Sequence, residues 1–151
     1  MTAALRRVWR HRQPGFTLVE LLVVISIIAI LATIGVVSFQ SAGQSSRNAK
    51  RQTDIETVRQ ALVLFRVDNG RYPSFSDLGI TPNGRSDNYY KILIPYLERQ
   101  NYLSKGSEDR LIDPTNTDPY VYRYNVFSAN QEFWLRYHTE PGSVLVEVRN
   151  P

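Results

Sequence analysis

A long run of apolar residues near the N-terminus dominates the pattern of this chain. No residue between Leu21 and Val37 is charged, and at about 1.5 Å per residue this run, together with Phe16 to Val19, is long enough to cross a bilayer core. The pattern therefore predicts one membrane-length helix. Glu20 lies at the N-terminal end of this helix, where an acidic side chain is costly and by default marks a functional site.

The helical pattern continues past the apolar run as an amphipathic segment. Its apolar residues recur at helical spacing at Ile55, Val58, Leu62 and Phe65. Asn69-Gly70 is a C-cap signal, because glycine readily adopts the left-handed conformation that ends a helix. Since no proline interrupts the pattern, we expect a continuous helix from about Phe16 to Asn69. The charged residues of its middle part are expected to stay in water or to meet neighbouring subunits: Arg47, Lys50, Arg51, Asp54, Glu56 and Arg59.

The residues after Gly70 predict a small head in which a short helix precedes three strands. Residues 74–88 and 105–119 are expected to form loops, and residues 89–102 a helix with Pro95 as its favoured start and with Leu93, Leu97 and Tyr102 turned inward. Three β segments joined by short turns favour an antiparallel meander: 120–127, 133–138 and 144–149. The sheet needs a cover, and the amphipathic half of the long helix is the only element of adequate size, so the expected fold class is α+β.

Length and charge narrow the class of protein. A chain of 151 residues is one domain by length, and the apolar run does not contribute to the core of a soluble part. The chain has 18 Lys and Arg against 14 Asp and Glu, but the whole excess lies before Pro14, in Arg6, Arg7, Arg10 and Arg12. By the positive-inside bias this leader stays cytoplasmic and the head lies outside. The rest of the chain is formally neutral, so specific nucleic-acid binding is not predicted.

The stretch from Gly15 to Val24, GFTLVELLVV, resembles the class III signal of the type IV pilin superfamily. In that family a prepilin peptidase cuts after the glycine and methylates the new N-terminal residue, so the resemblance implies cleavage after Gly15 and methylation of Phe16. The acidic residue of the family falls on Glu20, which implies a role in assembly, with a Phe16 amine as its partner. Residues 68–74, DNGRYPS, are similar to the end of the long helix in major pilins and in the major pseudopilins of type II secretion.

This resemblance implies the type IV pilin fold and four parts of the chain: a leader at 1–15, a transmembrane and filament-core helix at 16–37, an amphipathic half at 38–70 and a head at 71–151. The implied function is that of a structural subunit of a type IV pilus, with a pseudopilin of a type II secretion or DNA-uptake system as the alternative. The implied partners are other copies of the chain in a helical filament, the prepilin peptidase, the inner-membrane assembly platform and the membrane. The subunit would begin as a single-pass precursor in the cytoplasmic membrane and end in a cell-surface or periplasmic filament.

Other interpretations stay open beside this one. The apolar helix could be a signal anchor only, or the chain could be a monomeric membrane-tethered binding module, which would tolerate loss of Glu20. No enzyme is predicted, because the chain has no cysteine, no glycine-rich phosphate loop and only two distant histidines, His11 and His138. Alternating tyrosines on the first predicted strand are expected to pack on the sheet: Tyr120, Tyr122 and Tyr124.

The lack of cysteine also concerns the C-terminal region, which many pilins close with a disulfide. Packing, strand pairing or an ion must hold this region here. The best candidates for metal ligands are Asp113, Asn116 and Asp118, because carboxylate and amide oxygens clustered in a loop suit Ca²⁺. The resemblance to major pseudopilins implies calcium in this general region. Asp, Asn and Pro are also ordinary turn formers, so we expect no cofactor and keep calcium as the alternative.

Overall fold

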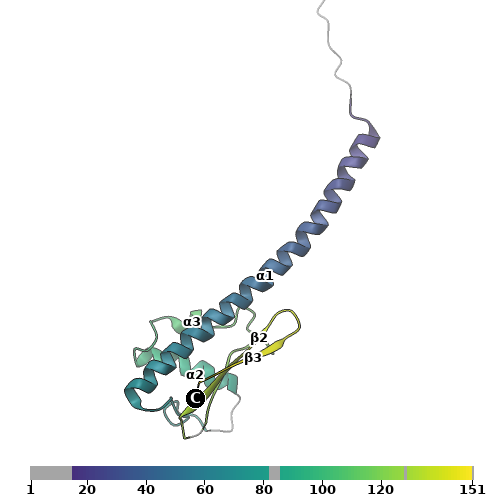
Figure 1. Cartoon of the computed structure of the whole chain (residues 1–151). Helices are drawn as coiled ribbons and strands as arrows, with labels where there is room; N and C mark the ends of the chain where they lie inside the picture. The colour runs from purple at the N-terminus through teal and green to yellow at the C-terminus, as the bar shows by residue number, and fades with distance from the viewer. Residues whose placement is uncertain (1–14, 82–85, 128, 151) are drawn as a thin grey trace, which may run out of the picture. The chain divides into compact units, whose positions relative to one another are not determined.

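The computed structural model of the chain describes residues 15–81, 86–127 and 129–150. Apart from Gly15, the expected leader lies outside the described residues. The chain divides into two compact units, Met1–Gln40 and Ser41–Pro151. In chain order the elements are α1 (Leu18–Asn69), α2 (Ser86–Arg99), α3 (Ser107–Arg110), β1 (Arg123–Phe127), β2 (Glu132–Thr139) and β3 (Val144–Asn150) (Figure 1).

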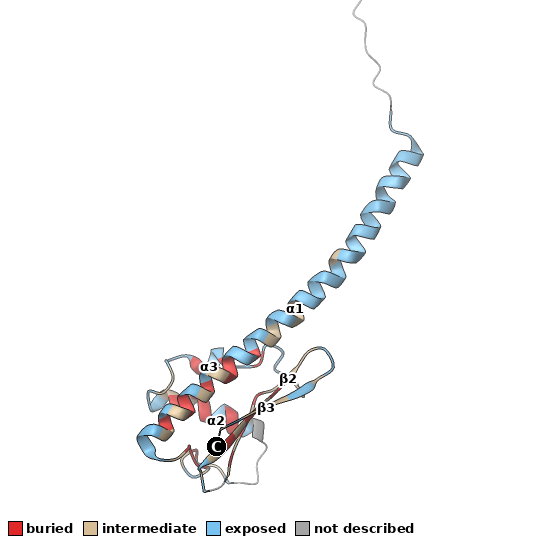
Figure 2. Ribbon diagram, viewed as in Figure 1, coloured by how far each residue is buried: buried red, intermediate tan, exposed pale blue. Residues whose placement is uncertain are grey.

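Helix α1 is continuous over 52 residues, which confirms the expectation drawn from the absence of proline. It ends where the sequence predicts, because Gly70 adopts a φ of 70° and its N–H donates to the carbonyl of Arg66 at 2.8 Å. Every residue from Leu18 to Ile34 is exposed (Figure 2). Among the described residues α1 is the helix that is long and apolar enough to cross a membrane, and its most apolar window is 0% buried.

The three strands form an antiparallel sheet in the order β1-β2-β3, which confirms the predicted meander. Tyr124 of β1 lies opposite Leu135 of β2, and Leu135 lies opposite Val148 of β3. Burial alternates along β1 and β2, as expected for a sheet with one covered face. The first strand begins at Arg123, three residues later than predicted, since Tyr120 forms an isolated bridge with Thr117 instead.

The core of the head lies between the covered face of this sheet and the helices. The predicted stripe of α1 is buried, and Val58 and Leu62 are 0% exposed. Helix α2 packs against β1, and residues of α1, α2 and the strands form one buried cluster, so α1 is not alone in covering the sheet. Figure 2 shows the buried residues gathered in the second half of α1, in α2 and in the strands.

Three expectations for the helices of the head are wrong. Helix α2 covers Ser86–Arg99 instead of residues 89–102, so residues 86–88 are helical and not part of the loop. Pro95 lies inside α2 instead of starting it, and Leu93 and Leu97 on either side are 0% exposed, as predicted. The burial of this apolar face outweighs the hydrogen bond that proline removes from a helix. Residues 105–119 are not loop throughout, because α3 forms a short turn of helix at Ser107–Arg110.

The tyrosines of the first strand are packing residues, as predicted. Tyr124 is 0% exposed and its hydroxyl donates to the carbonyl of Pro73 at 2.9 Å. The ring of Tyr122 contacts Tyr90 of α2 edge to face, with 5.3 Å between the ring centroids. Tyr120 is half-buried at the rim of the core.

Candidate functional site

The start of α1 is closed by a reciprocal set of hydrogen bonds between Thr17 and Glu20. The Glu20 carboxylate accepts from the backbone N–H and from the hydroxyl of Thr17, both at 2.8 Å, and the Glu20 N–H donates to the Thr17 hydroxyl oxygen at 3.2 Å. This arrangement is a capping box, which satisfies backbone donors that the first turn of a helix leaves unpaired. Glu20 therefore has a partner within its own chain as well as the expected one in a filament.

Gly15 and Phe16 precede this cap as exposed, non-helical residues. Among the described residues, and apart from Gly15 and its chain neighbours, no heavy atom lies within 4 Å of the position that a Cβ on Gly15 would occupy, and the Phe16 side chain is 88% exposed. The chain itself thus places no steric demand on residue 15. Both residues are open to a peptidase, which is the arrangement that cleavage between them would need.

The middle of α1 differs most from the sequence-based expectation. We expected Arg51 and Asp54 to stay in water or to meet neighbouring subunits, but within the single chain they are already 0% and 7% exposed. Arg51 lies one helical turn before Ile55, on the same buried face of α1. Asp54 lies one turn before Val58, also on this face. Both charges therefore enter the head, where they need partners.

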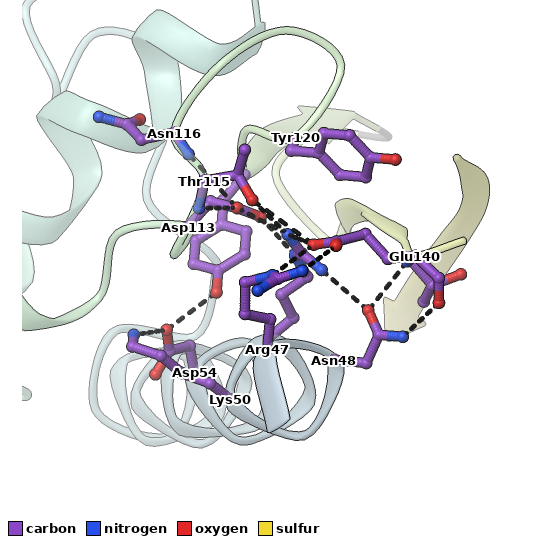
Figure 3. Close-up of polar contacts among 12 residues, drawn as sticks. Arg47, Asn48, Lys50, Asp54, Asp113, Thr115, Asn116, Tyr120 and Glu140 are labelled. Atoms are coloured by element: carbon purple, nitrogen blue, oxygen red, sulfur yellow. Dashed lines mark hydrogen bonds and ion pairs between the residues drawn. The ribbon is translucent and has the colours of Figure 1, made fainter. Parts of the chain in front are cut away.

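The Arg51 guanidinium is surrounded by oxygen atoms from three segments, and Figure 3 labels the residues that contribute them, Asn48, Asp113, Thr115 and Glu140. Its Nε and Nη2 donate to the two carboxylate oxygens of Asp113 at 2.8 and 3.1 Å. Nη2 also reaches Thr115 Oγ1 at 2.9 Å and Glu140 Oε1 at 2.8 Å. We call the set of Asn48, Arg51, Asp113, Thr115 and Glu140 the Arg51 centre; Nη1 donates to Asn48 Oδ1 at 2.8 Å. The guanidinium also lies 5.0 Å from the ring centroid of Tyr120.

Glu140, in the turn between β2 and β3, is held from α1 by two further residues. Arg47 Nε donates to Glu140 Oε1 at 2.9 Å, and the Glu140 backbone N–H donates to Asn48 Oδ1 at 3.0 Å. Asn48 also donates through Nδ2 to the Glu140 carbonyl. The β2–β3 turn is therefore fixed to α1 by ion pairs and amide contacts, the kind of tie that a chain without cysteine needs in this region.

Asp54 forms a second polar contact on the same side of α1. Its Oδ2 accepts from the Tyr122 hydroxyl at 2.8 Å and pairs with Lys50. Lys50 Nζ also donates to the carbonyls of Arg110 and Ile112 at 2.9 and 3.2 Å. Burial, followed by the adjacent Asp54 carboxylate, raises the pKa of the Tyr122 hydroxyl above its ordinary value, so this contact holds the protonated phenol.

The protonation states of the Arg51 centre are fixed by the same contacts. Burial alone would lower the pKa of the Arg51 guanidinium, but the hydrogen bonds to Asp113 and Glu140 outweigh it and raise the pKa. The hydrogen bond from Arg47, opposed by burial and reinforced by Arg51, lowers the pKa of Glu140 from 4.5 to about 2. Both partners are charged at neutral pH.

This shift predicts a dependence of stability on pH. Because the folded pKa of Glu140 is depressed, its contribution is complete above about pH 4.5 and is lost as the pH falls through about 2. We expect Glu140→Gln to lower the melting temperature of the head at pH 7, and the difference from the wild-type chain to shrink as the pH approaches 2. The measurement is thermal unfolding in detergent, followed by Trp134 fluorescence in a Trp9→Phe background, where Trp134 is the single tryptophan. A difference that stays constant between pH 7 and pH 2 would contradict the prediction.

The structure does not bring the three predicted metal ligands together. The Asp113 carboxylate faces Arg51, and its Oδ1 also accepts from the backbone N–H groups of Thr115 and Asn116 at 2.8 and 3.4 Å. The Asn116 amide points away from the Arg51 centre (Figure 3). Asp118 is paired with Arg123 at 2.8 Å. Within residues 15–81, 86–127 and 129–150 no three His, Cys, Asp or Glu side chains are grouped so that they could hold a metal ion.

The residues that the sequence analysis missed are Arg51, Asp54 and Glu140. A signal for the first two was present in the helical spacing. Arg51 precedes Ile55 and Val58 by four and seven residues, and Asp54 precedes Val58 by four, so both lie along the apolar face. A charged residue on that face predicts a buried partner. No comparable signal marks Glu140, because a charged residue beside Pro141 and Gly142 is ordinary for an exposed turn.

Comparisons with known proteins match the N-terminal segment to a family model and most of the chain to relatives. Residues 10–36 match the family model described as prokaryotic N-terminal methylation motif. Type II secretion system core protein G of Klebsiella michiganensis is 38% identical over 133 residues, which are 82% of this chain and 87% of that protein. The protein of the same name from Pectobacterium carotovorum subsp. carotovorum is 39% identical over 109 residues, 72% of this chain and 65% of that protein.

A third relative, type II secretion system core protein G of Vibrio cholerae serotype O1, is 32% identical over 111 residues, which are 65% of this chain and 75% of that protein. Coverage varies among these relatives, since the chain spans less than two thirds of the Pectobacterium protein and 46% of the one from Aeromonas hydrophila. No solved structure matches the chain significantly.

Proposed function

The chain belongs to the family of type II secretion system core protein G, within the type IV pilin superfamily, and from this premise we propose that it is a pseudopilin of a type II secretion system. The first expectation was a pilus subunit, with a pseudopilin as the alternative. The relatives favour the alternative. We propose no catalytic role for the chain.

One observation carries this proposal, namely an alignment that continues past the N-terminal signal into the head. The match to the Klebsiella michiganensis protein extends over 133 residues, whereas the methylation motif accounts for residues 10–36. A shared export signal alone would have left the head unmatched. The similarity therefore concerns the part of the chain that distinguishes one class of pilin-like protein from another.

The exposed half of α1 gives the mechanism of the proposed assembly. Its apolar side chains, from Leu18 to Val37, need lipid or neighbouring helices around them, and each one removed from water contributes about 1.5 to 3 kcal/mol. In the membrane lipid covers this face. In a filament the same face would be covered by other copies of the chain, so that transfer from membrane to filament keeps it out of water throughout.

The residues at the start of α1 would make this transfer specific. Cleavage after Gly15 by a prepilin peptidase would expose the α-amino group of Phe16, which stays positively charged when methylated. Glu20 lies one helical turn away in the same chain, and within a bundle it could pair with the amine of a neighbouring subunit. Apolar helices alone slide past one another at little cost, so this pairing would select one axial stagger. The other proposed partners are the peptidase and an inner-membrane assembly platform.

A deletion strain tests the choice between pseudopilin and pilus subunit. Without this chain we expect folded exoproteins to stay in the cell-associated fraction, and surface fibres in electron micrographs to remain at wild-type number. Expression of the chain from a plasmid should restore release, and expression of the Glu20→Leu chain should not. Normal release together with loss of surface fibres would reject the pseudopilin and favour the pilus subunit.

A further inference from the structure

The Arg51 guanidinium lies where a bound cation would join the loops of the head to α1. We propose that Arg51 is the resident cation of this head: it holds the 113–115 loop and the β2–β3 turn on α1, and the described part of the head therefore binds no calcium and needs none. The inference concerns the chain's own side chains and does not depend on whether the protein acts in secretion.

The surroundings of the guanidinium are those of a hard cation. The atoms that accept from it are all oxygens, contributed by two carboxylates, a hydroxyl and an amide: Asp113, Glu140, Thr115 and Asn48. Ca²⁺ is bound by the same types of atom. The guanidinium differs from a metal ion in being attached to α1, so its position is set by the helix and not by the concentration of an ion.

Sequence distance shows what this cation connects. Asp113 and Glu140 lie 62 and 89 residues beyond Arg51 along the chain. The Arg51 and Asp113 side chains are 0% and 1% exposed, and that of Glu140 is 13% exposed. One buried positive charge thus joins two segments that no disulfide can hold, since the chain has no cysteine.

Charge balance leaves no place for a divalent ion at this centre. The two carboxylates, Asp113 and Glu140, are matched by two guanidinium groups, Arg51 and Arg47, each within hydrogen-bonding distance. A Ca²⁺ ion using these oxygens would have to displace Arg51, and a buried guanidinium without its partners is strongly destabilising. The remaining predicted ligands do not compensate, because Asp118 is paired with Arg123 and the Asn116 amide points elsewhere (Figure 3).

Calcium titration of the full chain in detergent is the first test, with Trp134 fluorescence in the Trp9→Phe background as the probe of head unfolding. We expect the melting temperature in EDTA and in about 1 mM CaCl₂ to agree within about 2 °C. If the head had a calcium site, a calcium concentration about a hundredfold above its Kd would instead raise the melting temperature by about 10 °C. Any rise of more than about 2 °C on addition of calcium overturns the proposal.

The second test removes the cation itself. Arg51→Met keeps an unbranched stem that reaches about as far as the arginine Nε, but it removes the guanidinium and leaves two carboxylates without their buried partner. We therefore expect the melting temperature to fall by at least about 10 °C. Arg59→Met is the matched control, because Arg59 lies on the same helix and forms a local ion pair with Glu56, at 2.7 Å. We expect this control to lose less than about 4 °C.

A loss for Arg51→Met no larger than that for Arg59→Met would overturn the proposal. If Arg51→Met fails to fold at all, this counts as the predicted loss, and the calcium titration of the wild-type chain still decides independently. Neither measurement involves secretion, so failure here leaves the proposed function untouched, and failure of the deletion experiment leaves this inference untouched.

Discussion

Glu20→Leu is expected to give a subunit that is cleaved normally and stays in the membrane but fails to enter filaments. Near the membrane interface Glu20 can remain hydrated. In a bundle of α1 helices it would be surrounded by Leu, Ile and Val side chains, where an unpaired carboxylate costs several kcal/mol. The Phe16 amine of a neighbouring subunit would remove that cost only when the two helices have one particular stagger. A leucine carries no charge to pair with this amine, so nothing would hold the two helices at that stagger.

The capping box at the start of α1 provides the controls that separate pairing from helix capping. Glu20→Gln keeps a side chain that can close the box with Thr17 but carries no charge, so we expect it to fail in assembly as Glu20→Leu does. Thr17→Val removes the capping hydroxyl, at a cost of about 1 kcal/mol of helix stability, and keeps the carboxylate. We therefore expect Thr17→Val to assemble. Glu20→Asp, with its charge one methylene shorter, should be partly active.

The measurement combines an immunoblot for the mature form with the amount of the chain that sediments with filaments from sheared envelopes. Wild-type recovery of Glu20→Leu in the filament fraction would contradict the pairing mechanism. Normal assembly of Glu20→Gln would show that capping, not charge, is the contribution of Glu20. Loss of cleavage in Glu20→Leu would assign the residue to processing.

Gly15→Val is expected to accumulate as the uncleaved, full-length form. A peptidase must draw extended backbone into its site, and a branched side chain at the residue before the cut obstructs close approach. The described part of the chain leaves room for the change, because beyond the chain neighbours of Gly15 it places no heavy atom within 4 Å of the position of a Cβ there. A defect in Gly15→Val therefore reports on the peptidase and not on folding of the subunit.

The check is mass spectrometry of the membrane fraction, which distinguishes a chain that begins at Met1 from one that begins at N-methylated Phe16. Gly15→Ala is the graded control, since its single methyl group obstructs less, and we expect partial maturation. The melting temperature of the head should be the same in all of these variants. Maturation of Gly15→Val at the wild-type rate would reject cleavage after Gly15 as the processing step.

The features that depend on local periodicity were determined by the sequence itself. The apolar run and the stripe from Ile55 to Phe65 fixed the course of α1, because no proline intervenes and Gly70 supplies its end. Alternation and short turns likewise determined the β meander and its order. The order of Gly15, Phe16 and Glu20 carried the family resemblance, which the relatives confirm. In each case neighbouring residues contain the whole signal.

Only the tertiary structure decided the charges of the head. Periodicity could place Arg51 on the buried face of α1, but its partners lie 62 and 89 residues away, and no local pattern announces a contact across such a distance. The composition of the loop around Asp113 suits a metal ion as well as it suits a guanidinium, and only the fold places Arg51 against that carboxylate. Pro95 is a third case, because the burial of Leu93 and Leu97 against the sheet keeps it inside α2. Burial creates the demand for a partner, and the fold alone determines which residue meets it.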